Sequence, residues 1–237
     1  MSLPLLFLSA HRAHFWSQVI GAAGTNGAAL VPSLRRDRSF QGMAARILAD
    51  APPRFGVVCA CLGACVAFEI VRAAPGRIRS LVLINASASP DAGWRADIRR
   101  RRIESLSSRT AFQALQAQGH EKTLSWMLAP ESLADPVIVR SALRAIEPDA
   151  RQVQLRQQIA MLERRDFQEV LKAIDAPTLI VAGAQDRMCP ATQSVTMHVA
   201  IAGSRLEIIE RCGHMAVIEQ PAVLSGLLGR WRQAAAT

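Results

Sequence analysis

The chain has 237 residues, of which 50% are hydrophobic and 20% charged, so it can bury a large core and is neither a disordered nor a fibrous sequence. Its formal net charge is +9, and all but two of its 28 basic residues are arginines. Apart from the run Arg99 to Arg102 these arginines are spread along the chain, and tyrosine is absent, so the composition argues against a nucleic-acid-binding protein.

The first ten residues, MSLPLLFLSA, are apolar but do not look like a targeting segment. They lack the basic residues that begin a signal peptide, and they are too few to span a bilayer. We therefore expect a cytoplasmic protein without a membrane partner. In that reducing compartment the five cysteines would remain thiols, which argues against a disulfide framework.

Short apolar runs alternate with helical patterns at both ends of the chain. In chain order, the first part predicts a strand at 5–9, helices at 13–21 and 40–49, a strand at 55–59, a helix at 63–74 and a strand at 81–85. The last part predicts strands at 178–182 and 206–209, with helices at 192–200 and 221–231. This alternation indicates a parallel sheet covered by helices on both faces.

The middle of the chain has a different character. From Ser89 to about Asp166 there is no strand pattern, and polar helical stretches are broken at Gly119, Pro130, Pro136 and Pro148. We interpret this segment as a helical cap inserted into the sheet domain. The predicted organisation is a first part of the core at 1–88, a cap at 89–166 and a second part of the core at 167–237.

Three cysteines occur in the segment VVCACLGACVAFEIV, residues 57–71, where a predicted strand turns into a helix. A metal site is a poor interpretation, because the ligands would be split between a strand end, a turn and a helix without a second Cys/His cluster nearby. Cys61 sits on the turn itself, where the positive end of a helix dipole stabilises a thiolate or an oxyanion. We expect Cys59 and Cys65 to pack in the core.

This segment resembles the nucleophile elbow of the α/β-hydrolase fold, usually G-x-S-x-G, with Cys61 in the serine position, Cys59 in place of the first glycine and Gly63 as the second. TLIVAGAQDRMCP resembles the family's acid segment and offers Asp186, while RLEIIERCGHMAVIEQP resembles its histidine segment and offers His214. The resemblance covers essentially the whole chain. It implies an α/β protein of the α/β-hydrolase fold, a mostly parallel sheet flanked by helices with an inserted helical cap.

The resemblance also implies acyl transfer by a Cys–His–Asp triad without a cofactor or a metal. His214 would take the proton from Cys61, while Asp186 would hold the imidazole in the correct tautomer. Asp91, just after the third predicted strand, is an alternative acid. Cys189 lies beside the acid in sequence and brings another thiol near the site, although packing is its expected role.

The resemblance places an oxyanion hole between the elbow and the loop after the first strand. One donor would be the backbone N–H of Leu62, the residue after the nucleophile. The second would come from the loop Ser9-Ala10-His11, where we take His11 first and Ala10 next.

Three residues of the cap, Trp94, Trp126 and Met127, are our candidates for lining the substrate pocket. The run Arg99 to Arg102 is usually a solvated face, but it would also attract an anionic substrate such as a coenzyme A or carrier-protein thioester.

The leading hypothesis is an enzyme that cleaves a small-molecule ester, lactone or thioester, similar to the small esterase, enol-lactonase and thioesterase members of the family. One alternative is an acyltransferase or cyclase acting on a coenzyme A or carrier-protein thioester. Another is a non-catalytic small-molecule-binding protein derived from a hydrolase, against which the intact Asp186 and His214 weigh. The sequence leaves the oligomeric state open.

Overall fold

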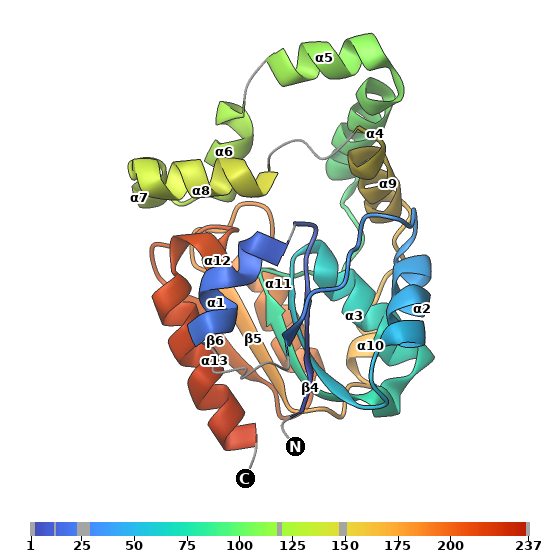
Figure 1. Ribbon diagram of the computed structural model, residues 1–237, viewed down its shortest axis with the longest axis vertical. Coiled ribbons are helices and arrows are strands. Elements are labelled where there is room, and N and C mark those ends of the chain that lie inside the picture. The colour runs from blue at the N-terminus through green and yellow to red at the C-terminus, as the bar shows by residue number, and fades with distance from the viewer. Residues whose placement is uncertain (1–2, 12, 23–28, 118–119, 147–150, 236–237) are drawn as a thin grey trace.

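A six-stranded sheet forms the centre of the computed structural model, which describes residues 3–11, 13–22, 29–117, 120–146 and 151–235 (Figure 1). The strand order is β2-β1-β3-β4-β5-β6, and all five pairings are parallel, which confirms the predicted sheet. The strands are β1 (Leu5–Leu8), β2 (Ala29–Leu30), β3 (Phe55–Ala60), β4 (Ile78–Ile84), β5 (Thr178–Gly183) and β6 (Arg205–Ile209).

Helices cover both faces of this sheet (Figure 1). One face carries α2 (Phe40–Asp50), α3 (Leu62–Ala73), α10 (Gln168–Leu171) and α11 (Ala191–Ala200). The other carries η1 (Ala13–Trp16), α1 (Ser17–Ala22), α12 (Ala216–Glu219) and α13 (Pro221–Ala235). The short turn η2 (Pro75–Arg77) leads into β4.

The inner strands are mostly apolar because both of their sides are buried along most of their length. Within β3, Val57 and Cys59 pack toward α2 and α3, while Val58 and Ala60 pack toward α1 and α13. A strand buried on both faces reads as a continuous hydrophobic run, which is why these strands stand out in the sequence. The two-residue strand β2 at the sheet edge is too short to give such a signal, and the sequence did not predict it.

Between β4 and α10, the described residues form six helices that sit over the carboxyl ends of the strands (Figure 1). Proline opens α7 and α8, where its missing N–H costs no helical hydrogen bond. The predicted breaks at Gly119 and Pro148 lie outside the described residues. The six helices are α4 (Gly93–Ser107), α5 (Arg109–Ala117), α6 (Glu121–Met127), α7 (Pro130–Leu133), α8 (Pro136–Ile146) and α9 (Arg151–Leu162).

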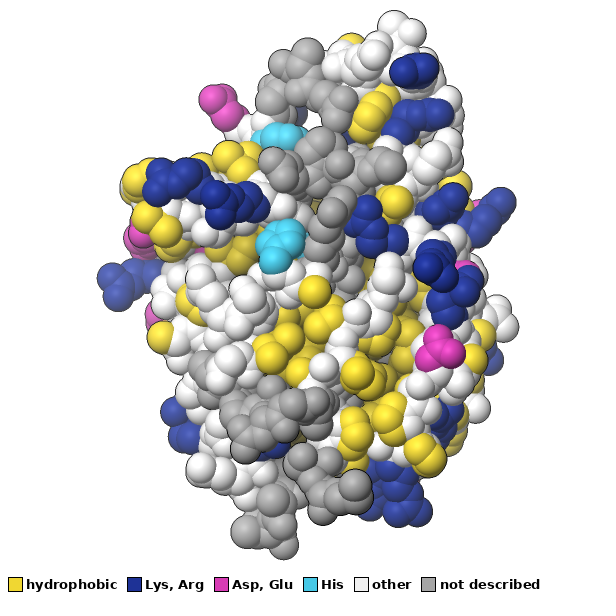
Figure 2. Space-filling model, in the orientation of Figure 1, with side chains coloured by type: hydrophobic (Ala, Val, Ile, Leu, Met, Phe, Trp, Pro, Cys, Tyr) yellow, Lys and Arg dark blue, Asp and Glu magenta, His cyan; other side chains and the backbone are white. Residues whose placement is uncertain are grey.

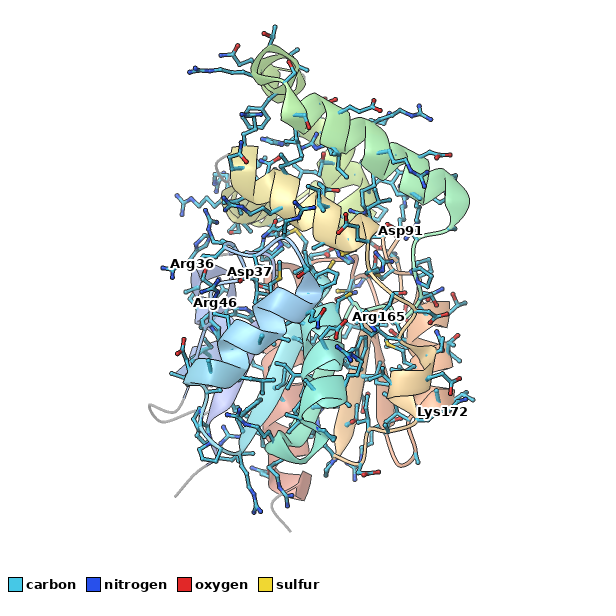
Figure 3. The ribbon with its side chains drawn as sticks, turned by 90° about the vertical axis from the view of Figure 1, so that its right-hand side faces the viewer. Arg36, Asp37, Arg46, Asp91, Arg165 and Lys172 are labelled. Carbon is cyan, nitrogen blue, oxygen red and sulfur yellow. The ribbon has the colours of Figure 1, made fainter. Side chains whose placement is uncertain are left out.

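Basic side chains form several separate groups on the face shown in Figure 2, on the cap as well as on the sheet domain. On the side shown in Figure 3, Arg46 pairs with Asp37 at 2.8 Å, and Lys172 pairs with Glu169 at 2.8 Å. Among the described helices, none is both long enough and apolar enough for a membrane crossing.

Candidate active site

Cys61 lies on the turn between β3 and α3, at the carboxyl edge of the sheet. Its backbone has φ 49° and ψ −116°, a region that residues with a side chain rarely adopt, and such strain concentrates at functional sites. Gly63 permits the turn, because a Cβ atom there would overlap the backbone carbonyl of Leu8. Cys59, in the place of the motif's first glycine, is fully buried and its thiol donates to the Val82 carbonyl at 3.2 Å. The elbow therefore forms despite the altered motif.

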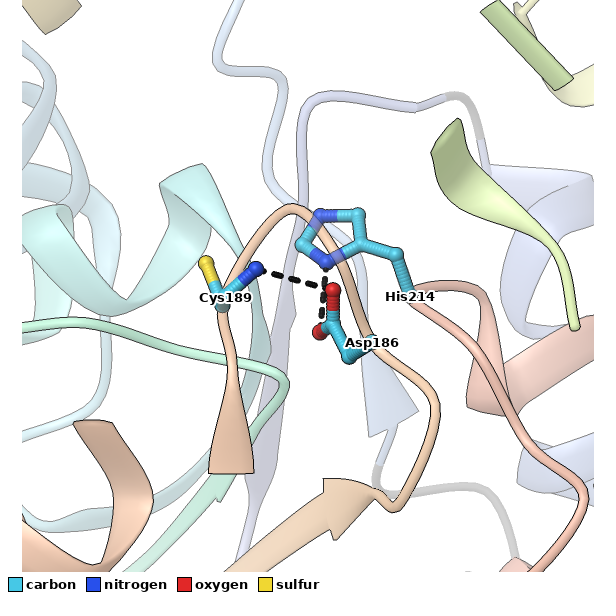
Figure 4. Close-up of side chains that lie close together, drawn as sticks. All are labelled: Asp186, Cys189 and His214. Atoms are coloured by element: carbon cyan, nitrogen blue, oxygen red, sulfur yellow. Dashed lines mark hydrogen bonds and ion pairs between the residues drawn. The ribbon is translucent and has the colours of Figure 1, made fainter. Parts of the chain in front are cut away.

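Asp186 and His214 follow β5 and β6, and both side chains are buried. Nδ1 of His214 donates to Oδ2 of Asp186 at 2.8 Å. Oδ1 of the same carboxylate accepts from the backbone N–H groups of Met188 and Cys189, each at 2.8 Å. Figure 4 draws the bond from Cys189. Because a carboxylate can only accept, Nδ1 carries a proton, and the other ring nitrogen is left for the hydrogen bond with Cys61.

The electrostatic environment favours a thiolate at Cys61 and an imidazolium at His214. The pKa of Cys61 is held well below its ordinary 9.0, first by a side-chain hydrogen bond with Cys189 and then by the charge and hydrogen bond of His214, which together outweigh burial. Burial lowers the pKa of His214, but the negative charges of Cys61 and Asp186 dominate and raise it well above 6.5. The same hydrogen bond raises the pKa of Cys189, so Cys189 stays protonated and acts as the donor.

We expect iodoacetamide to modify Cys61 before the other four thiols, because only Cys61 has a lowered pKa. Burial raises the pKa of Cys59 and Cys212, and that of Cys65 to about 12. A group with a lowered pKa stays ionised until the pH falls through that value, so labelling should already be at its plateau where an ordinary thiol is still protonated. Mass mapping after limited alkylation at several pH values measures this.

Cys189→Ala removes the hydrogen bond that lowers the pKa of Cys61 most, so the midpoint of Cys61 labelling should move to higher pH. The control is Cys65→Ala, which removes another thiol lining the same cavity and should leave the midpoint in place. Labelling of Cys189 or Cys212 ahead of Cys61 would contradict the assignment of Cys61 as the reactive thiol.

A cavity of about 250 Å³ lies beside Cys61, between the cap and the sheet domain. The sheet domain contributes Cys61, Cys189 and His214 to its wall, and α4 contributes Arg95 and Arg99.

The cap residues predicted to line a pocket do not line this cavity. Trp94 and Trp126 are 53% and 42% exposed, and Met127 is also absent from the described wall. Arg95 and Arg99 are one helical turn apart and face the cavity, so the preceding Trp94 is turned aside.

Asp91, the alternative acid, is part of a cap ion pair and not of the histidine's surroundings. Its carboxylate accepts from Arg99 at 2.7 Å and from Arg164 at 3.0 Å (Figure 3 labels Asp91). Burial opposes ionisation, but the hydrogen bond with Arg99 and the charge of Arg164 prevail, so the pKa of Asp91 is lowered. Asp186 is the carboxylate that contacts His214.

Asp186, Cys189 and His214 also meet a distance condition for a metal site, since one ligand atom of each lies within 4.8 Å of the others (Figure 4). Both oxygens of Asp186 already accept hydrogen bonds, one of them from His214. A metal ion bound there would have to break these bonds. The set is therefore better arranged for proton transfer than for metal binding.

Comparison with known proteins agrees with this geometry. Residues 5–227 match the alpha/beta hydrolase family. The chain belongs to that family. The pimeloyl-[acyl-carrier protein] methyl ester esterase of Neisseria meningitidis is 27% identical over 191 residues, which cover 78% of this chain and 70% of that protein.

Two further relatives show how far the likeness extends. A proline iminopeptidase of Lactobacillus acidophilus is 33% identical over 69 residues, a stretch that spans 29% of this chain and 23% of that protein. The structure of a thermophilic esterase from Thermogutta terrifontis with malate bound superposes with a TM-score of 0.83 at 20% identity, covering 100% of this chain and 92% of that one. The second likeness shows the shared alpha/beta hydrolase fold alone.

Two buried residues that hold this alpha/beta hydrolase site together were not predicted from the sequence. Asn85, at the end of β4 and at φ 48°, donates through Nδ2 to Asp186 at 2.8 Å and to the carbonyl of Gly213 at 3.1 Å. It therefore fixes both the acid and the loop that carries the histidine. The only signal in the sequence is its position directly after an apolar run.

Glu219 is the second of these residues. Its carboxylate accepts from the backbone N–H groups of Gly213 at 3.0 Å and Ala129 at 2.8 Å. The backbone N–H of His214 in turn donates to the carbonyl of Met127 at 2.6 Å. These bonds join the histidine loop to the turn between α6 and α7, so Met127 meets the site through its backbone.

Proposed function

We propose that this chain is an enzyme that cleaves a carboxylic ester, lactone or thioester by acyl transfer through Cys61. The observation that carries the proposal is the meeting of a strained elbow cysteine with a buried Asp186–His214 pair that lowers the pKa of its thiol. A thiolate–imidazolium pair of this kind is ready to react before the substrate binds. The ester substrate of the Neisseria relative supports a small acyl substrate for this chain as well.

In the first half of the proposed reaction, the Cys61 thiolate attacks the carbonyl carbon, a C–S bond forms and the carbonyl π electrons move to oxygen. The imidazolium of His214 then gives its proton to the leaving oxygen or sulfur as the tetrahedral intermediate collapses. In the second half, His214 takes a proton from water, the hydroxide attacks the thioester, and Cys61 leaves as a thiolate.

The oxyanion would be held by the backbone N–H groups of Leu62 and Ala10. Leu62 is the first residue of α3, where an N–H has no partner within the helix. The N–H of His11, our first choice from the sequence, already donates to the Ser9 hydroxyl at 3.3 Å, which turns it away from this task. Ala10 is therefore the second donor that we propose.

The test is to trap the acyl group. Wild-type protein is mixed with p-nitrophenyl esters, lactones and acyl thioesters, quenched in acid and mapped by mass spectrometry. We expect an added acyl mass on the Cys61 peptide and a slower reaction, by roughly 10² to 10⁴, for Cys61→Ser, because a hydroxyl supplies no preformed anion and relies wholly on general-base help. Cys65→Ala is the control and should keep the acyl mass on Cys61. Acylation of Cys189, or a faster serine variant, would contradict the proposal.

A further inference from the structure

The cavity beside Cys61 is strongly basic on its cap side. Arg95 and Arg99 reach it from α4, and Arg164 reaches it from the segment after α9. Within the described part of the wall, Asp91 is the one carboxylate that faces these three guanidinium groups. Side chains alone therefore leave the cavity with a surplus of positive charge.

Two of these arginines are well removed from water, since the side chains of Arg99 and Arg164 are 17% and 5% exposed. Charges buried to this extent cost free energy unless partners compensate them. The charge of Arg164 is compensated by hydrogen bonds, because it donates to Asp91 at 3.0 Å and to the carbonyl of Ser89 at 2.9 Å. These bonds hold Arg164 in place in the basic wall of the cavity.

The guanidinium of Arg99 has hydrogen-bond partners for only some of its nitrogens. Nε donates to Asp91 at 2.7 Å and Nη1 donates to Gln158 at 2.7 Å, while Nη2 has no hydrogen-bond partner among the described residues. Nη2 is also not among the fully buried unpaired atoms of the described chain, so it keeps some accessible surface, and Arg99 lines the cavity. Arg95 closes the other side, where it donates to the carbonyls of Met188 at 2.6 Å and Arg187 at 3.1 Å.

We propose that this cavity binds a carboxylate carried by the acyl part of the substrate, with Arg99 as its main partner and Arg95 beside it. This inference rests on the proposed function, because it assigns the substrate class of the same site. A guanidinium holds a carboxylate through parallel N–H donors, which gives orientation as well as charge compensation.

The size of the cavity places the anion in the acyl part and not in a coenzyme A leaving group. About 250 Å³ is below the range of roughly 300–1,000 Å³ that accommodates drug-sized ligands, and one wall of this space is Cys61 itself. An anion bound by Arg99 is therefore only a few bonds from the reacting carbonyl. The phosphates of coenzyme A lie at the far end of the long pantetheine arm, outside such a space.

Arg100, next to Arg99 on α4, provides a control for the effect of charge alone. Arg99 lines the cavity, whereas Arg100 is exposed and pairs with Asp97 at 2.6 Å. Both carry the same charge on the same helix, so replacing each in turn separates a binding contact from the general field of the cap.

The experiment compares p-nitrophenyl butyrate with mono-p-nitrophenyl succinate, whose acyl groups differ by a carboxylate in place of the terminal methyl. The readout is the ratio of kcat/KM for the succinyl ester to that for the butyryl ester. We expect wild type to favour the succinyl ester, and Arg99→Gln to lower the ratio roughly 10- to 100-fold, as for a lost charge-assisted hydrogen bond. Arg99→Lys keeps the charge without the planar fork and should fall in between, while Arg100→Gln should leave the ratio unchanged.

A binding measurement in a variant that cannot turn over substrate tests the carboxylate site separately from the proposed acyl transfer. In Cys61→Ala protein, succinate should raise Tm and butyrate should not, and adding Arg99→Gln should abolish the rise. If succinate stabilised the protein in an Arg99-dependent way but neither ester were turned over, the proposed acyl transfer would be contradicted and the proposed carboxylate site would be supported. Equal turnover of both esters with no stabilisation by succinate would overturn the anion site and leave acyl transfer standing. A ratio that falls equally in Arg100→Gln, or stabilisation by coenzyme A and not by succinate, would also overturn it.

Discussion

His214→Ala should lower turnover of any ester, lactone or thioester substrate by roughly 10³ to 10⁶, the loss seen when members of a triad act as one unit. Among the described residues, His214 is the only imidazole hydrogen-bonded to Asp186. Its charge also helps to lower the pKa of the Cys61 thiol. Its removal takes away the proton carrier and also raises the pKa of Cys61, so the midpoint of alkylation should move to higher pH. Steady-state kinetics and the labelling profile measure the two effects separately.

The control for this variant is His198→Ala on α11, whose ring contacts the hydroxyl of Ser204 at 2.8 Å and takes no part in the site. It should retain turnover. Stabilisation of the protein by a bound ligand should persist in His214→Ala, because the cavity wall loses one ring and keeps its arginines. A non-catalytic binding protein would instead show no wild-type turnover and a ligand response indifferent to the substitution.

Asp186→Asn should lower turnover about 10⁴-fold, the effect of placing the histidine in the wrong tautomer. The new amide oxygen would take the position that accepts from the N–H groups of Met188 and Cys189, which turns the amide nitrogen toward His214 and Asn85. Two donors would then face that nitrogen. His214 relieves the conflict by accepting at Nδ1 and carrying its proton on the other nitrogen, where it can no longer take a proton from the thiol.

The matched comparison is Asp91→Asn, which changes the other buried carboxylate near the cavity. Because Asp91 contacts Arg99 and Arg164 and not His214, this variant should cost far less turnover of a neutral ester than Asp186→Asn. Thermal unfolding of both variants checks that the folds remain comparable. Equal losses in the two variants would mean that the acid has been assigned to the wrong residue.

The sequence by itself determined the sheet and the three segments that carry the candidate triad. Strands buried on both faces are apolar along most of their length, so β1, β3, β4 and β5 contain short hydrophobic runs between helical patterns. The elbow is also local information, because the tight turn at Cys61 and the contact of Gly63 with β1 restrict which residues fit. The chain order of Cys61, Asp186 and His214 then follows from the order of the strands.

Only the tertiary structure decided what surrounds these three residues. The loops after β3, β4, β5 and β6 converge at one edge of the sheet, which brings Cys189 to Cys61 and Asn85 to Asp186 from segments far apart in the chain. The residues that line the cavity could not be predicted from the sequence either. The apolar residues of α4 form no distinct stripe, so the sequence does not show which side of this helix is buried. In the structure α4 packs against α9 and α5, and Arg95 and Arg99, not Trp94, line the cavity beside the thiol.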